Sequence, residues 1–341
     1  MSITVSGKVR VSLSSPLANP LGCGVMASGD RRNGPFGGQA LIEGVMIRGP
    51  RTMATAIRTP DGQILTETQL IASGAAEPLR RIPFLRGIIA LYDTFALGIR
   101  ALYRSARIAQ GHDRQRASAV DIAFATVVIA VAAAIFFTGP VLMTSWAGDS
   151  RAGEWVEVVL EGALRLAMLL GYVWFIGRLP EVQRVFAYHG AEHRTVHAYE
   201  HGLELTPDTV RTFANAHPRC GTAFLLTVAA LSFVAFLALG TPSLPERILE
   251  RIILTPLIAA AAYELIRATQ QFEHHPLARL LASPNGWLQS WTTRDPDDGQ
   301  IEVAIAAMTA AIAAEQTADA ALSPLLVEVD AANATDAPID T

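Results

Sequence analysis

Ile122-Ala-Phe-Ala-Thr-Val-Val-Ile-Ala-Val-Ala-Ala-Ala-Ile-Phe-Phe-Thr-Gly-Pro-Val-Leu-Met-Thr-Ser-Trp-Ala-Gly148 is a stretch without a single charged side chain. It exceeds the ~20 apolar residues that a helix needs to cross the hydrocarbon core of a bilayer, so we predict a transmembrane helix here. The composition agrees, because 51% of the 341 residues are hydrophobic and only 17% are charged. A soluble protein of this size is normally less apolar.

Three more apolar segments predict three further transmembrane helices. The second span covers about residues 156–178 and contains Glu161 and Arg165, which are four residues apart and can pair on one helix face. The third lies between Cys220 and Pro245, and the fourth covers about residues 247–267. We therefore predict a mainly α-helical, multi-pass (polytopic) membrane protein with about four transmembrane helices and a small cytoplasmic α+β part near the N-terminus.

Arginine is unevenly distributed between the two sides of these spans. It is frequent before the first span and in the segment 179–219, and sparse in the loops that follow the first and third spans. The positive-inside rule then places both termini and residues 179–219 in the cytoplasm. The predicted spans make the lipid bilayer the expected partner, and because the net charge is −4, no overall basic field suggests nucleic acid.

The segments outside the spans differ in character. An Asp61-Gly62 turn between two β-prone runs predicts a hairpin, and Asp93 would make the helix around it expensive to insert across a membrane. We therefore divide the chain into a flexible extension (1–32), a Gly-rich β-hairpin region (33–82), an amphipathic helix in the membrane interface with its arginines toward anionic lipid headgroups (83–116), transmembrane helices one and two (120–178), a cytoplasmic His-rich segment (179–219), transmembrane helices three and four (220–268), C-terminal cytoplasmic helices (269–316) and a disordered acidic tail (317–341).

A few charges lie in otherwise apolar surroundings. Glu43 and Arg48 interrupt the Gly-rich region, where we expect a surface ion pair on a small sheet; the alternative is that Glu43 faces the histidines described next. Glu264 lies near the inner end of the fourth span. We expect it either to face protein or a polar cavity or to pair with Arg267.

Four of the eight histidines recur every four residues in Tyr188-His-Gly-Ala-Glu-His-Arg-Thr-Val-His-Ala-Tyr-Glu-His201. On a helix each step of four advances by about 40°, so His189, His193 and His197 share a stripe with Glu200. The first five residues from His189 also read H-x-x-E-H, in which two histidines hold a metal and the glutamate, here Glu192, handles a proton. The alternative is a polar helix face without a metal.

His217-Pro-Arg-Cys220 precedes the third span and offers two more metal ligands. Two arrangements then compete. A closed set of His193, His197, His217 and Cys220 is typical of structural zinc. An open set of His189 and His193, with Glu200 or His197 as third ligand and Glu192 as base, is typical of a catalytic site. One ion cannot bind the whole stripe, because residues eight apart on a helix are about 12 Å apart.

The sequence resembles the YqhQ-like bacterial membrane proteins, which form domain-of-unknown-function family 1385. The similarity covers roughly residues 33–315 and rests on four segments: Phe36-Gly-Gly-Gln-Ala-Leu-Ile-Glu-Gly-Val-Met-Ile-Arg-Gly-Pro50, Tyr188-His-Gly-Ala-Glu-His-Arg-Thr-Val-His-Ala-Tyr-Glu200, His217-Pro-Arg-Cys-Gly-Thr222 and Thr292-Thr-Arg-Asp-Pro-Asp-Asp298. The resemblance implies a multi-pass protein of the bacterial inner (plasma) membrane and a metal-dependent enzyme. It implies no reaction or substrate.

Two functional hypotheses follow. The first is a hydrolase at the cytoplasmic membrane surface that depends on zinc or another divalent metal, with Glu192 activating water and a lipid headgroup or a membrane-proximal peptide as substrate. The second is a scaffold or accessory factor for other membrane proteins, in which a structural metal clamps the segment 180–222 to the N-terminal part.

Overall fold

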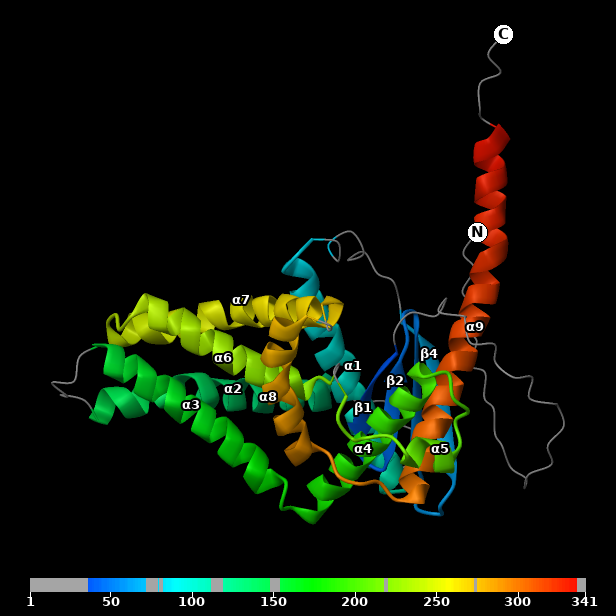
Figure 1. Cartoon of the computed structure of the whole chain (residues 1–341), viewed down its shortest axis with the longest axis horizontal. Helices are drawn as coiled ribbons and strands as arrows, with labels where there is room; N and C mark the ends of the chain where they lie inside the picture. The colour runs from blue at the N-terminus through cyan, green and yellow to red at the C-terminus, as the bar shows by residue number, and fades with distance from the viewer. Residues whose placement is uncertain are drawn as a thin grey trace, which may run out of the picture.

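A computed structural model describes residues 36–71, 79, 82–111, 119–147, 154–217, 220–272 and 275–335 of the chain. These residues form a helical bundle at one end and an α+β part at the other, as Figure 1 shows. The predicted flexible extension at residues 1–32 lies outside the described residues.

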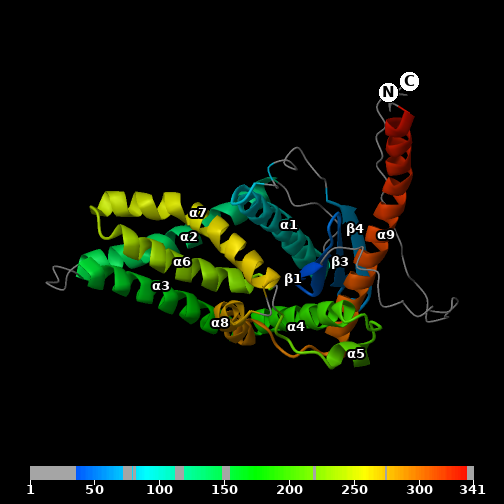
Figure 2. The same ribbon diagram turned by 45° about the horizontal axis from the view of Figure 1, so that its top comes forward.

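The bundle consists of helices α2 (Ala119–Ala147), α3 (Glu154–Ile176), α6 (Thr222–Leu239) and α7 (Leu244–Gln271), which lie side by side (Figures 1 and 2). Stretches of α2, α3 and α7 are long and apolar enough to cross a membrane, as predicted for the first, second and fourth spans. The third predicted span is a shorter apolar helix, whose apolar stretch is Phe224–Leu239. Large apolar side chains cover the outside of the bundle, which is the surface that a lipid environment would contact.

Helix α9 (Asp298–Thr335) also contains a stretch long and apolar enough for a span. Its apolar face is already covered, however, because Ile301, Ala304 and Met308 are fully buried in a core shared with the β-sheet. The helix continues to Thr335, through most of the segment 317–341 that composition predicts to be a disordered tail. The alanines of this segment have high helix propensity. The prediction of a disordered tail rested on its acidic residues and did not take this propensity into account.

The sheet has four antiparallel strands in chain order: β1 (Gly37–Leu41), β2 (Gly44–Arg48), β3 (Thr52–Arg58) and β4 (Ile64–Leu70). The predicted hairpin is confirmed as β3 and β4, with Arg58 opposite Ile64. Gly62 lies in its turn at φ +84°, a conformation that glycine adopts without strain.

The sheet packs against helices from two distant parts of the chain, α4 (Pro180–Glu200) and α9, with the short α5 (Pro207–Arg211) beside them (Figure 1). One core joins Val45 of β2 and Ala54 of β3 to Ala191 of α4 and Met308 of α9. The segments 33–82 and 179–219 and helix α9 therefore share one core, although they are far apart in the sequence, whereas α8 (Pro276–Thr292) packs against α6 and α7 of the bundle.

Helix α1 (Leu85–Ala109) connects this unit to the bundle. Near its start Arg86 pairs with Glu264 of α7, and near its end Arg104 pairs with Glu67 of β4. Two arginines that we expected to face lipid headgroups thus pair with acidic side chains of the protein. The predicted partner of Glu264, Arg267, is replaced by an arginine that lies far away in sequence.

A buried ion-pair network lies in the bundle, where the first turns of α7 meet α3 at the end far from the sheet (Figure 1). The predicted pair of Glu161 and Arg165 is confirmed, with 2.6 Å between carboxylate oxygen and guanidinium nitrogen. Arg247 and Arg251 of α7 also donate to Glu161, at 3.1 and 3.0 Å. This single buried carboxylate therefore holds α3 and α7 together.

Candidate metal centre

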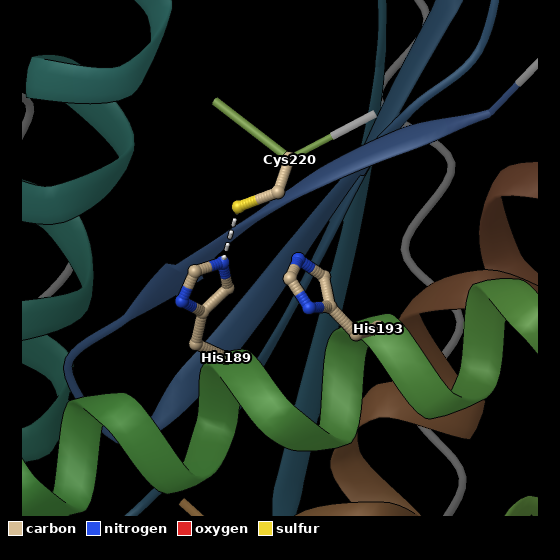
Figure 3. Close-up of side chains that lie close together, drawn as sticks. All are labelled: His189, His193 and Cys220. Carbon is tan, nitrogen blue, oxygen red and sulfur yellow. Dashed lines mark hydrogen bonds between the residues drawn. The ribbon is translucent and has the colours of Figure 1, made fainter. Parts of the chain in front are cut away.

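Helix α4 carries the predicted histidine stripe. It begins with Pro180 in its first turn, where the missing N–H costs no helical hydrogen bond, and the chain leaves it through Gly202 at φ +68°. Tyr188, Ala191 and Val196 of this helix are buried in the core with the sheet. Packing of these residues fixes the rotation of α4 and hence the direction of the histidines, which point toward the chain at the start of α6 (Figure 3).

His189, His193 and Cys220 form the first cluster, and their ligand atoms all lie within 4.8 Å of one another. Figure 3 shows both imidazoles projecting from α4 toward the Cys220 side chain. The sulfur of Cys220 lies 3.3 Å from Nε2 of His189 and 3.1 Å from the hydroxyl of Thr222. Two ring nitrogens and one thiol converge here from elements that are about 30 residues apart in sequence.

Backbone carbonyls fix the tautomers of both histidines. Nδ1 of His189 lies 2.9 Å from the carbonyl oxygen of Thr292, and Nδ1 of His193 is hydrogen-bonded to the carbonyl oxygen of Asn215. Because a carbonyl only accepts, each Nδ1 carries the hydrogen and each Nε2 keeps its lone pair. Metal-binding histidines are held in the same way by an outer carbonyl or carboxylate.

His197, Glu200 and His217 form a second cluster, whose ligand atoms also lie within 4.8 Å of one another. Nε2 of His217 is 3.4 Å from a carboxylate oxygen of Glu200. The side-chain amide of Gln289 on α8 (Pro276–Thr292) bonds both main-chain groups of His217, at 2.8 and 3.0 Å. The His217 ring lies between the two clusters, with its centroid 5.6 Å from that of His193 and 4.5 Å from that of His197.

Glu192 is buried beside the first cluster, and its carboxylate lies 3.5 Å from Nε2 of His193. It fits against Gly38 of β1, where a Cβ atom would come within 2.3 Å of the carboxylate oxygen. Burial raises the pKa of Glu192, against the opposing influence of His189 and His217. A buried carboxyl with a raised pKa is well suited to accept and return a proton.

Burial also lowers the pKa values of His193, His197 and His217. A lowered pKa keeps these imidazoles neutral near pH 7, and a neutral imidazole is the form that binds a metal. The electrostatics of both clusters therefore favour the ligating form of their histidines.

Neither ligand set inferred from the sequence lies together as a whole. The open set contributes His189 and His193, but the third group beside them is Cys220, in place of Glu200 or His197. The closed set is divided between the two clusters. His201, the last histidine of the series, lies outside both and is exposed.

Glu43 takes no part in either cluster. It lies in the β1–β2 turn at φ 52° and pairs with Arg184 in the second turn of α4, while Arg48 lies 3.8 Å from Asp93 of α1. The single surface ion pair that we expected on the sheet is thus replaced by two pairs, each with a partner on a helix. The pair with Arg184 ties the N-terminal sheet to the start of the histidine helix.

The DUF1385 family model, described as "Protein of unknown function", matches residues 82–314. This chain belongs to the DUF1385 family. It is also 32% identical over 285 residues to the uncharacterized protein YqhQ of Bacillus subtilis (strain 168), covering 79% of this chain and 90% of that protein. No solved structure matches the chain. The region matched by the DUF1385 model contains both clusters and Glu192, and it begins after the sheet that holds Gly38.

Within the DUF1385 region, several residues that support the ligands could not be recognised from sequence patterns. Asn215 accepts from His193 through its carbonyl and from Nε of Arg194 through its side chain, at 2.7 Å. Gln289 is an isolated amide on an amphipathic helix, and nothing in its surroundings pointed to His217. Thr292 was marked only by the family resemblance of its segment.

Proposed function

We propose that this protein is a metal-dependent hydrolase embedded in a membrane, with His189, His193 and Cys220 as ligands of a zinc or similar divalent ion. The observation that carries the proposal is that the ligand atoms of three side chains converge beside a buried carboxyl. Two of these side chains are histidines whose tautomers are fixed by backbone carbonyls. Catalytic zinc sites commonly have three protein ligands and leave one position for substrate or water.

The residues fit such an ion. Zinc bonds of about 2.3 Å to sulfur and 2.0–2.1 Å to nitrogen, at a tetrahedral angle, separate the two ligand atoms by roughly 3.5 Å. The observed separation between Cys220 and His189 is 3.3 Å, so these two side chains need little adjustment. An ion held here would polarise a carbonyl or phosphoryl oxygen and make a water molecule more acidic.

Glu192 acts in this proposal as the proton acceptor for the attacking water and as the donor to the leaving group. Burial raises the pKa of Glu192 above that of an exposed glutamate, which makes it a stronger proton acceptor. Glu192 itself is buried, and its carboxylate packs directly against the backbone of Gly38, which limits its movement. In this arrangement Glu192 would act on the reacting water, and His189, His193 and Cys220 would hold the ion.

The position of the centre suggests the substrate class. Two ligands come from α4 and the third from the chain just before α6, and the end of α8 supplies the carbonyl that holds His189; these elements lie where the bundle meets the α+β part (Figure 2). If the bundle spans the bacterial inner membrane with the orientation that the arginines predict, the centre lies at the cytoplasmic surface. A lipid headgroup or a membrane-proximal peptide is the substrate that reaches this location.

A structural metal site is the second candidate. It is favoured by the burial of Cys220 and His193 and by the way their contacts join α4 to α6, as a clamp in a scaffold or accessory factor for other membrane proteins would. In that case Glu192 becomes the fourth ligand and no position remains for substrate. The two candidates therefore differ in whether the bound ion has an open position.

The test begins with metal content, measured by mass spectrometry on protein purified in detergent without chelators. We expect bound zinc in the wild type, loss of the ion bound by this cluster in His193→Ala and in Cys220→Ala, and no change in His201→Ala, the matched histidine control. Cobalt substitution then probes the open position: azide should shift the visible spectrum of a catalytic site. An unchanged spectrum would support the structural candidate, and a wild type without metal would overturn both.

Glu192→Gln tests the proton-transfer role. The variant should keep the metal and lose hydrolysis of the model substrates p-nitrophenyl acetate and p-nitrophenyl phosphate. General acid–base groups contribute about 10²–10⁴-fold, so the loss should fall in that range. Loss of the metal together with activity would instead make Glu192 a ligand.

A further inference from the structure

We infer that His197, Glu200 and His217 hold a second divalent cation beside the first, so that the site is a two-metal centre. The inference deepens the proposed function and rests on it, because the second ion would act on the same substrate. The mechanism proposed above makes no use of this cluster, although its ligand atoms gather as closely as those of the first.

The geometry of the second cluster suits a metal of the same size. Two ligands bound at about 2.1 Å to one ion, at angles of 90–110°, lie roughly 3.0–3.5 Å apart. Nε2 of His217 and the carboxylate of Glu200 are separated by 3.4 Å. His197 and Glu200 are three residues apart on α4, a spacing that places them on the same face of the helix.

Hydrogen bonds to the backbone hold both histidines in place. The Ala216 carbonyl oxygen lies 2.8 Å from Nε2 of His197, so this nitrogen donates its hydrogen and Nδ1 keeps the lone pair. Gln289 fixes the backbone of His217 through two hydrogen bonds. Outer contacts of this kind orient the ligands of established metal sites.

The donor atoms distinguish the second site from the first. The first offers two nitrogens and a sulfur, and the soft thiolate favours zinc. The second offers two nitrogens and a carboxylate oxygen, a set that accepts zinc, manganese or ferrous iron. Glu200 is exposed, whereas all three ligands of the first site are buried or partly buried, so we expect the second ion to exchange more readily.

The two sites are close enough to act together. The rings of His193 and His217, one from each cluster, have centroids 5.6 Å apart. The Glu192 carboxylate lies 3.5 Å from Nε2 of His193, the ring that lies beside His217. A carboxyl between two cations can direct a water molecule at a substrate that both ions hold, as in other two-metal hydrolases.

Cobalt titration of metal-free protein tests the inference, because cobalt reports on its ligands. A thiolate-to-cobalt charge-transfer band marks the site with Cys220, and mass spectrometry counts all bound cobalt. We expect the band to saturate after one equivalent in the wild type while bound cobalt rises to two. His217→Ala should bind one equivalent and keep the full band, whereas His201→Ala should bind two.

Glu200 is the exposed ligand of the second site, so substituting it gives a second variant that leaves the core undisturbed. Glu200→Gln should weaken only the second cobalt, by at least the roughly 10–100-fold that loss of an outer-shell partner costs. A wild type that stops at one equivalent with the full band would overturn the two-metal inference and leave the proposed function standing. A wild type that binds no cobalt would overturn the proposed function itself.

Discussion

Substituting Glu161 by glutamine should destabilise the bundle more than any other single isosteric change in α3. The carboxylate is 1% exposed and accepts from three arginines: from Arg165 at 2.6 Å, from Arg247 at 3.1 and 3.3 Å, and from Arg251 at 3.0 and 3.2 Å. Glutamine keeps one acceptor oxygen, but it removes the negative charge and turns an amide N–H₂ toward guanidinium donors. Three buried arginines then lose the carboxylate that they share, and among the described acidic side chains only the partly exposed Glu157 and Glu250 still pair with two of them.

The magnitude follows from the burial. Removing one partner of a buried ion pair costs about 3–5 kcal/mol, because the remaining charge stays desolvated. The five hydrogen bonds cannot be summed at about 1.5–3 kcal/mol each, since contacts within one network are not additive. We expect a loss of about 3–5 kcal/mol, which changes the unfolding equilibrium by roughly two to three and a half orders of magnitude.

Unfolding in mixed micelles with increasing SDS, followed by tryptophan fluorescence and circular dichroism, measures this loss. Glu157→Gln is the matched control: it lies one turn earlier on α3, is 23% exposed and makes one hydrogen bond of 3.0 Å to Arg247. Its loss should stay below about 1 kcal/mol, as for other partly exposed pairs. If the two variants differ by less than 1 kcal/mol, the account of Glu161 as the buried centre of the network is wrong.

Three further changes test the α+β part. Gly38→Ala places a methyl group 2.3 Å from the Glu192 carboxylate, so we expect lower turnover of the p-nitrophenyl substrates at unchanged metal content. Gly37→Ala is the control, because the space around its Cβ position is open. Equal activities of the two variants would refute the contact. Gly190→Ala puts a Cβ 2.2 Å from the Arg294 carbonyl oxygen and should cost about 1–3 kcal/mol, read as a lower melting temperature; an unchanged value would mean that this chain segment moves freely. The fully buried Glu315 carboxylate of α9 accepts hydrogen bonds from the main-chain N–H and from Nε of Arg51, at 3.0 and 3.1 Å. Glu315→Gln removes the charge and weakens these bonds, so we expect faster proteolysis of α9. Proteolysis at the wild-type rate would contradict the anchoring role of Glu315.

Features that depend on neighbouring residues were predictable from the sequence. The β3–β4 hairpin follows from an Asp-Gly turn between β-prone runs, and the pairing of Glu161 with Arg165 follows from the four-residue spacing on a helix. The bundle helices α2, α3 and α7 follow from the length of their apolar runs. In each case the information lies within one or two elements, where chain geometry leaves few alternatives.

Features that depend on packing between distant elements were missed or only partly foreseen. Composition alone does not tell whether the apolar face of α9 covers a sheet or meets lipid, because both surroundings favour the same side chains. The arginines of α1 looked free to bind headgroups, but Glu67 and Glu264 lie on elements that only the fold brings beside them. Charge pairs between distant segments leave no pattern in a single sequence.

The candidate centre separates these two kinds of information most clearly. The sequence by itself determined that His189, His193 and His197 share one helix face and that no single ion binds all of them, because helical geometry sets those positions. Tertiary structure alone decided that Cys220 joins the first two and His217 joins the third. Neighbouring residues on one helix supply two or three donor atoms along one line, whereas a metal ion needs donor atoms on several sides. The remaining donor must come from another element, and the packing of α4 against the sheet and α9, together with the contact of His189 with the end of α8, sets where that element lies.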